Sequence, residues 1–235
     1  MVLGMNLAHS KDGILYNIDD QVKIECNDCK GCQHCCQNMN GTIILDPYDI
    51  WQLTHKLKIS GGKRVTFEVL ISEDGPLELG SHEGMVLPHL KMVATDRADV
   101  GECPFLNNGR CSIHFCRPGF CRLFPLGRVY TKNDDKTELS YIILDDEIGC
   151  KVKDTNCIKV RDWIGIDDDK YYEFLCKWHC LKKYVVSMVE DGKLDVNSEE
   201  YMDIQMEVLK VFYFTPYGQD FFREFDERLK MINIV

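Results

Sequence analysis

The chain has 235 residues, of which 45% are hydrophobic, and its formal net charge is −10 at pH 7. A chain of this length and composition can bury a core of its own, so it does not need its cysteines to staple a miniature fold. The negative charge would repel a phosphate backbone, which excludes an ordinary nucleic-acid partner. No run approaches the roughly 18 apolar residues of a membrane span.

The first part of the chain is expected to form short strands and one helix. Apolar residues alternate with polar ones over residues 14–24, which predicts weak strands and turns. Residues 42–45 are a short strand-like run. Asp46 and Pro47 then predict the N-cap and first position of a helix, which should end before Gly61.

The middle of the chain is expected to be strand and loop. Alternation of Val65, Phe67 and Val69 predicts a strand before turn signals at residues 74–76. A stretch rich in cysteine, glycine and proline runs from 101 to 127. Strand candidates at 127–132 and 138–145 flank a polar turn and predict a hairpin.

The last part of the chain reads as helical, with apolar residues three and four apart over 169–190, 198–214 and 218–230. The sequence therefore predicts an α+β fold: an irregular, metal-organised, cysteine-rich core with short strands, plus a helical C-terminal section. We place the cysteine-cluster domain at residues 1–157 and the helical section, packed on it, at 158–235.

The cysteine content indicates metal binding. The 13 cysteines are an odd number, so complete pairing into disulfides would leave one thiol over. Residues 1–10 show no charged start followed by an apolar run, so we expect a protein that stays in the cytoplasm. In that reducing compartment a dense set of cysteines binds metal or carries chemistry more often than it forms disulfides.

The first cysteine block contains Cys26, Cys29, Cys32, Cys35 and Cys36. Thiolates two residues apart on a turn point to a common centre, as in zinc and iron–sulfur sites. Four of these cysteines, all except Cys35, follow the C-x2-C-x2-C-x3-C spacing of bacterial ferredoxins. The four from Cys29 onward also follow C-x2-C-x2-C-C, and the sequence leaves both interpretations open.

The second block runs from Cys103 through Cys111 and Cys116 to Cys121, with the segments Cys-Pro-Phe-Leu, Cys-Ser-Ile and Cys-Arg-Leu-Phe-Pro. With the paired cysteines of the first block and a later Gly-Cys at Cys150, these segments resemble the CxxCxxCC cysteine-cluster family. That family is described as a zinc- or iron-chelating domain and includes flagellin lysine N-methylases. The resemblance covers roughly residues 29–150.

The resemblance implies a set of shared cysteines that is twice the four thiolates of a cubane cluster or a structural zinc. One or two metal centres are therefore expected. The implied ligands are Cys29, Cys32, Cys35, Cys36, Cys103, Cys111, Cys121 and Cys150. Cys26 and Cys116 lie outside the family pattern and are added as candidate ligands because they extend the two blocks.

Iron–sulfur is favoured over zinc on three grounds. The ferredoxin-like spacing is one, and the lack of histidines in ligand spacing is another. The third is a basic segment, residues 103–133, which contains no Asp or Glu and would offset the charge of thiolate-bound clusters. We expect one or two [4Fe–4S] clusters, with Zn²⁺ as the alternative. Arg117 and Arg122 are candidates for binding an anionic cosubstrate or the carboxylate of a substrate.

Three kinds of function remain open. The resemblance implies a protein-lysine N-methyltransferase that uses S-adenosylmethionine on a protein or peptide substrate, but the sequence shows neither a Gly-x-Gly-x-Gly loop after a strand nor a C-x3-C-x2-C run. Alternatives are a redox protein with an electron-transfer partner and a zinc-stapled binding module. No catalytic residue can be identified. Cys157, Cys176 and Cys180 could form a further centre, although small core residues are the more common use of helical cysteines.

Overall fold

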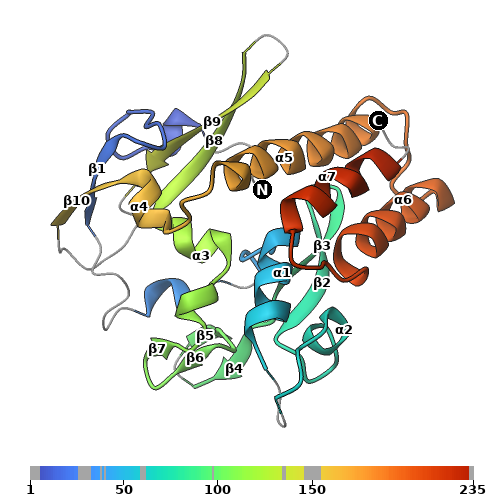
Figure 1. Cartoon of the computed structure of the whole chain (residues 1–235), viewed down its shortest axis with the longest axis horizontal. Helices are drawn as coiled ribbons and strands as arrows, with labels where there is room; N and C mark the ends of the chain where they lie inside the picture. Colours follow the sequence, from blue (N-terminus) through green and yellow to red (C-terminus); the bar gives the residue numbers. More distant parts are fainter. Residues whose placement is uncertain are drawn as a thin grey trace.

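The computed structural model describes residues 6–25, 33–37, 39, 41–58, 62–96, 98–133, 136–145 and 155–232. Helices and short antiparallel strand pairs are mixed along the chain, and helices dominate its C-terminal part (Figure 1). The predicted α+β class with a helical C-terminal section is therefore confirmed.

The described strands form two-stranded antiparallel ribbons. The predicted hairpin is present, with Leu126 opposite Ile143 at its base and Asn133 opposite Lys136 at its tip. The ribbons pair β1 (Gln21–Glu25) with β10 (Thr155–Lys159), β2 (Leu77–His82) with β3 (Met85–Leu90), β4 (Val93–Thr95) with β5 (Ala98–Glu102), β6 (Leu106–Asn107) with β7 (Arg110–Cys111), and β8 (Leu126–Asn133) with β9 (Lys136–Ile143).

The helices agree with the three predicted in the last part of the chain, except that the second is shorter and continues as a π-helical segment, Lys210–Phe214. None of the described helices combines the length and apolar composition needed to cross a bilayer. The helices are α1 (Pro47–Lys56), α2 (Phe67–Leu70), α3 (Gly119–Leu123), α4 (Val160–Ile164), α5 (Asp169–Glu190), α6 (Glu199–Leu209) and α7 (Phe221–Met231), and 3-10 turns cover Leu7–His9, His34–Cys36 and His114–Cys116.

The start of α1 is formed as the sequence predicted. Asp46 accepts a hydrogen bond from the backbone N–H of Asp49, and Asp49 accepts one from the N–H of Asp46, which is a reciprocal capping box. Just before it, the N–H of Leu45 donates to the carbonyl of Pro88 at 2.9 Å. Residues 42–45 therefore lie beside β3, joined to it by an isolated bridge between Ile44 and His89.

The strand predicted from Val65 to Val69 is wrong over its second half, which forms helix α2. Phe67 and Leu70 are buried, whereas Val69 is 41% exposed. Burial therefore follows the three-residue spacing of a helix, and the alternation that predicted a strand does not correspond to one buried face.

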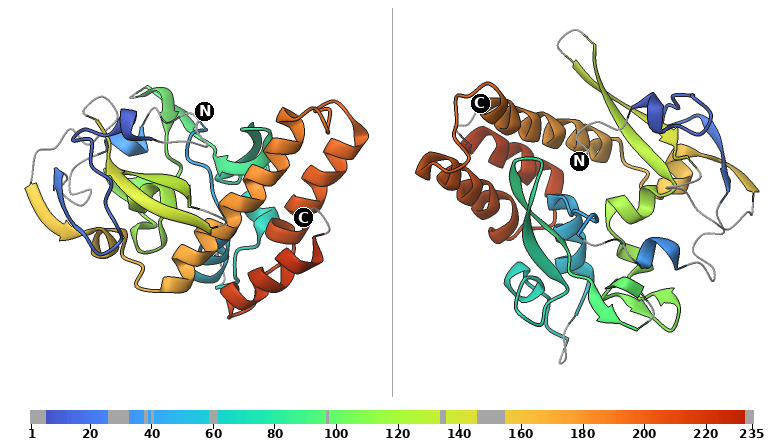
Figure 2. Two further views of the ribbon diagram at one scale, coloured as in Figure 1. Left: turned by 90° about the horizontal axis from the view of Figure 1, so that it is seen from above. Right: turned by 180° about the vertical axis from the view of Figure 1, so that it is seen from behind.

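The core of the helical section is aromatic. Phe174 of α5 meets Phe225 of α7 edge to face, with ring centroids 4.7 Å apart, and Tyr48 of α1 packs on Phe174 and Phe221. Figure 2 shows α5 and α7 lying side by side, with α6 beyond them. A single buried cluster includes these rings and apolar residues from before position 157, so the helical section packs directly on the rest of the chain.

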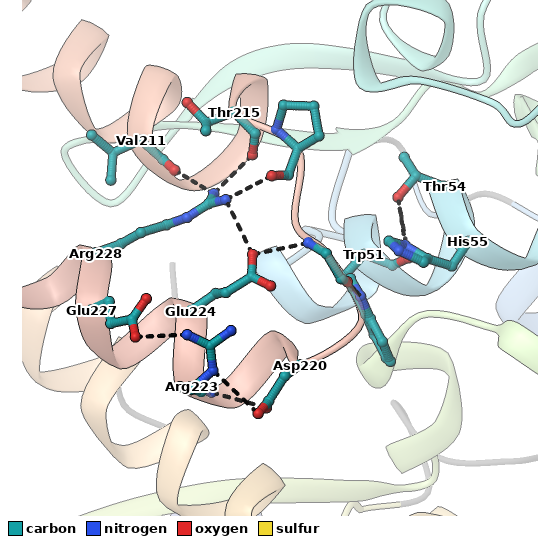
Figure 3. A network of polar contacts seen from close by, with 12 residues as sticks. Trp51, Thr54, His55, Val211, Thr215, Asp220, Arg223, Glu224, Glu227 and Arg228 are labelled. Carbon is teal, nitrogen blue, oxygen red and sulfur yellow. Dashed lines mark hydrogen bonds and ion pairs between the residues drawn. The ribbon is translucent and has the colours of Figure 1, made fainter.

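A polar network fixes α7 onto the π-helical segment and α1 (Figure 3). Arg228 donates to the carbonyls of Val211 and Thr215 at 2.7 and 2.8 Å, and thereby satisfies carbonyls that end a helix. Glu224 accepts from the N–H of Gly218, whose carbonyl accepts from the indole N–H of Trp51 at 2.8 Å. These bonds join α1 to two C-terminal segments, and Trp51 and Gly218 are 167 positions apart in sequence.

Candidate metal centre

The two cysteine blocks are joined by backbone pairing. Cys35 and Cys36 lie in the 3-10 turn His34–Cys36, and the N–H of Cys103 donates to the carbonyl of Cys36 at 2.7 Å. Next to this bond, Gln37 bridges to Glu102, and its side-chain amide donates to the Glu102 carboxylate at 2.8 Å. The end of strand β5 is thereby held against the paired cysteines.

A tight hairpin brings Cys111 to the same place. Strands β6 and β7 are joined by Asn108 and Gly109, both with positive φ angles of 49° and 76°, as a two-residue hairpin turn requires. Cys111 pairs with Leu106, whose N–H donates to the carbonyl of Cys103 at 2.9 Å. The Asn-Gly turn therefore sets Cys111 close to Cys103.

Helix α3 supplies Cys121, and a buried carboxylate positions this helix. The N–H of Gly119 donates to Asp49 at 2.7 Å. A Cβ at Gly119 would lie 2.9 Å from the Tyr171 hydroxyl and 3.0 Å from the Arg128 guanidinium, so a side chain there would force these two groups to move. The sequence predicted α1 and its cap, but it gave no signal that Asp49 also holds α3.

Five cysteines line one small cavity of about 20 Å³. Apolar side chains make up most of the remaining wall, and His114 and Arg117 complete it. In the part of the chain that the structure describes, no three His, Cys, Asp or Glu side chains are close enough to hold a single ion. The thiols thus surround a shared space without converging on one point. They are Cys35, Cys36, Cys103, Cys111 and Cys121.

The environment of these sulfurs opposes negative charge. Burial, together with the charge of the neighbouring Cys111, raises the pKa of the Cys103 thiol to about 11. Burial also raises the pKa of Cys121 well above its ordinary value, and Cys35, Cys103 and Cys111 add to the shift. Crowded, desolvated thiols ionise readily only when a cation compensates the charge. The donor set fits a thiophilic metal, because it contains sulfur and no carboxylate.

Several predicted site residues lie elsewhere. Cys116 is 1% exposed and does not line the cavity. Burial raises the pKa of its thiol, and the positive charges of Lys56 and Arg122 oppose this shift. Arg122 donates through Nε to the carbonyl of Arg117 at 2.8 Å and through Nη2 to that of Phe115 at 3.3 Å, so it holds the chain between the 3-10 turn and α3. The remaining predicted ligands, Cys26, Cys29, Cys32 and Cys150, lie outside the described residues.

The suggested further centre does not assemble among the described side chains. Cys176 and Cys180 on α5 line the groove between that helix and β9, where Cys180 Sγ lies 3.1 Å from the Thr137 hydroxyl. Cys157 is on β10, and its thiol donates to Gln21 at 3.5 Å. No metal-holding group of three includes any of them in the described chain.

Comparison with known proteins agrees with this geometry. Residues 28–142 match the model of the CxxCxxCC family, which is described as a "putative zinc- or iron-chelating domain". No curated protein and no solved structure gives a significant match to the chain. The match spans all five cysteines of the cavity and supports metal binding, with zinc and iron equally consistent with it. Over residues 28–142, the chain is therefore similar to the CxxCxxCC family.

Proposed function

We propose that this chain binds an iron–sulfur cluster at the cysteine cavity. The observation that carries the proposal is that five thiols from three separate segments line one cavity without three of them converging on a point. A tetrahedral zinc site needs sulfurs roughly 3.8 Å apart around one ion, as Zn–S bonds of about 2.3 Å require. A cluster spreads its thiolates over several iron atoms and suits a wider ring of sulfurs.

Three parts of the chain would hold the cluster. Cys35 and Cys36 would approach from the 3-10 turn, Cys103 and Cys111 from the β5–β7 region, and Cys121 from α3. When bound, such a cluster supplies one-electron redox chemistry or a Lewis-acidic iron. Arg117, which is 7% exposed and lines the cavity, is placed to offset the negative charge of thiolate-ligated metal.

Zinc is the second candidate, and the size of the cavity favours it. A space of about 20 Å³ accommodates one water-sized body, so a single ion enters with less movement of the sulfurs than a cluster. In that case the cysteines would staple the domain and the helical section would be free to bind a partner.

Metal analysis separates the two candidates. Anaerobically purified protein is assayed for iron, acid-labile sulfide and zinc per chain, and its visible spectrum is recorded. About four iron and four sulfide per chain, or about twice that for two clusters, supports the cluster. Zinc at about one or two ions per chain without sulfide contradicts the cluster and supports a structural zinc site.

A matched pair of variants tests the location. Cys121→Ala removes a thiol from the cavity wall, and Cys157→Ala removes an exposed thiol from β10. We expect Cys121→Ala to lose most of the bound metal and Cys157→Ala to keep it. Equal retention in both variants would place the metal elsewhere.

We propose separately the activity that the family resemblance implies, which is methyl transfer from S-adenosylmethionine to lysines of a protein or peptide. We also propose a cytoplasmic location. The assay of methyl transfer uses radiolabelled S-adenosylmethionine and a lysine-rich peptide with metal-loaded protein. Label in the peptide supports an enzyme. Its absence, together with reversible reduction of the centre, supports an electron carrier that acts on a redox partner.

A further inference from the structure

A second cavity, of about 320 Å³, lies between β8, α5 and the start of α1. Its volume is in the range of small-molecule sites, and most of its wall is apolar, as in such sites. The charged side chains that line it come from four different segments. They are Asp46, Asp49, Glu83, Arg128 and Lys182, and the larger apolar members include Phe124, Leu126, Leu175 and Trp178.

Arg128 is a cation without a paired anion in the described chain. Its Nη2 donates to the Tyr171 hydroxyl at 3.1 Å, whereas its Nε is buried and has no hydrogen-bond partner there. Burial opposes its charge, but the surrounding tyrosines and Asp46 together raise its pKa, so it stays protonated. Burying a guanidinium with an unpartnered N–H costs folding free energy, unless a bound anion accepts a hydrogen bond from it.

Lys182 lies beside this guanidinium, and burial lowers its pKa, while the charges of Glu83 and Asp46 raise it. Its ammonium makes no hydrogen bond or close ion pair with the described residues. Glu83 has the complementary property, because its buried Oε1 has no hydrogen-bond donor within the described chain. One cavity is therefore lined by a guanidinium with an unused buried N–H, an ammonium without a partner among the described residues, and a carboxylate oxygen without a donor there.

We propose that this cavity binds a small zwitterion, an α-amino acid with an apolar side chain. The carboxylate is held by Arg128 and Lys182, the ammonium donates to Glu83 and Asp46, and the side chain packs on Trp178 and the leucines of the wall. Both charges of the ligand are then matched, which neither a simple anion nor a simple cation achieves.

Charge balance argues for a zwitterion over a phosphate or a free amine. Burial, followed by the charge of Asp46, raises the pKa of Asp49 well above its ordinary value, which favours the neutral acid. Burial raises the pKa of Asp46 as well, but the positive charge of Arg128 opposes this shift. With Asp46 and Glu83 ionised, two cations face two carboxylates, so a ligand without net charge leaves the cavity balanced. This inference stands apart from the metal centre, because the two cavities share no lining residue.

Isothermal titration calorimetry with three matched compounds tests the proposal on the protein as purified. L-Phenylalanine carries both charges, L-phenylalaninamide lacks the carboxylate, and 3-phenylpropionate lacks the ammonium. We expect phenylalanine to bind with a Kd below about 1 mM and both analogues to bind at least about tenfold more weakly, as loss of a charged hydrogen bond implies. No binding of phenylalanine, or equal binding of either analogue, overturns the proposal.

Variants place the site. Lys182→Met should weaken phenylalanine binding by about tenfold, while its neighbour Lys183, which is exposed, should tolerate the same change to Met. Arg128→Gln should weaken phenylalanine most and leave the already weak binding of phenylalaninamide unchanged. Equal losses in the two lysine variants contradict the site. If Arg128→Gln does not fold, the lysine pair and the three compounds still decide the question.

Discussion

The helical C-terminal section and the cysteine region are stabilised in different ways. The helical section has a 22-residue helix, α5, whose aromatic side chains interlock with those of α7. The cysteine region has strands β6 and β7 of two residues each and helix α3 of five residues, arranged around thiols. The first is stabilised by contacts between the side chains of long helices, whereas elements as short as those of the cysteine region need tertiary contacts or a bound ion to persist.

Removal of metal should produce the largest difference between the two regions. Treatment with a chelator should lower amide hydrogen-exchange protection over residues 103–123 by at least tenfold, because bound metal contributes free energy to local folding. Protection in α5 and α7 should change little, since the ring packing and the Lys177–Asp226 ion pair that join them do not involve the cysteine cavity. Hydrogen exchange followed by mass spectrometry gives both values. A uniform loss in all helices would mean that the two regions unfold as one unit.

The reverse perturbation is Phe225→Ala, which removes a ring that is 1% exposed from between α5 and α7. We expect a loss of about 3–5 kcal/mol in the free energy of unfolding, as for other buried phenylalanines. Metal content should be unchanged where the variant is folded. Met231→Ala, at a 70% exposed position of the same helix, is the control and should stay within about 0.5 kcal/mol of the parent.

Acid should weaken the contact between α5 and the β8–β9 hairpin. Burial, with the charges of Lys182 and Lys183, lowers the pKa of His179 to about 4, and its ring stacks on Tyr130 with centroids 3.8 Å apart. The unfolded chain takes up this proton near pH 6.5, whereas the folded chain does so only near pH 4. Stability is therefore unaffected by this group above pH 6.5 and falls as the pH drops toward 4.

The expected loss from His179 is at most about 3 kcal/mol, at 1.36 kcal/mol per pH unit. Urea unfolding at pH 7 and at pH 4.5 measures it. His179→Phe keeps a ring for Tyr130 but cannot be protonated, so it should lose less stability between the two pH values than the parent. An identical loss in both proteins would assign the acid sensitivity to other groups.

The smallest expected effect concerns a helix cap. The Ser198 side chain accepts from the N–H of Tyr201 at the start of α6, so Ser198→Ala should cost about 1 kcal/mol of unfolding free energy. Ser187, whose hydroxyl donates to the Tyr184 carbonyl within α5, should tolerate the same change with little effect. Thermal unfolding of the two variants compares them directly, and equal effects would argue against a capping contribution.

The sequence predicted the fold best where local pattern and burial coincide. The spacing of apolar residues fixes α5 and α7, and Asp46 with Pro47 fixes the start of α1. Helices α3 and α4 were missed because each has five residues and neither has a side-chain cap. The strand at Val65–Val69 failed because tertiary burial selected a different face of the segment.

Part of the candidate site could also be predicted from the sequence. Cysteine spacing singled out all five sulfurs of the cavity, whose role as ligands stays a proposal. Spacing could not separate Cys116 from Cys111 and Cys121, because it does not reveal that Cys116 lies in the 3-10 turn His114–Cys116 and is buried outside the cavity. The second cavity gave no sequence signal. Arg128 and Lys182 are 54 positions apart and become neighbours only through the packing of α5 on the hairpin.

The segment 42–45 and helix α3 have one further consequence. Ile43 and Cys121 line the cysteine cavity, whereas their chain neighbours Ile44 and Phe120 line the other. The partition between the two compartments is thus a single layer of backbone. We expect a change in the position of Cys121 to be felt at Phe120, because the two residues are adjacent in α3 and interiors are closely packed.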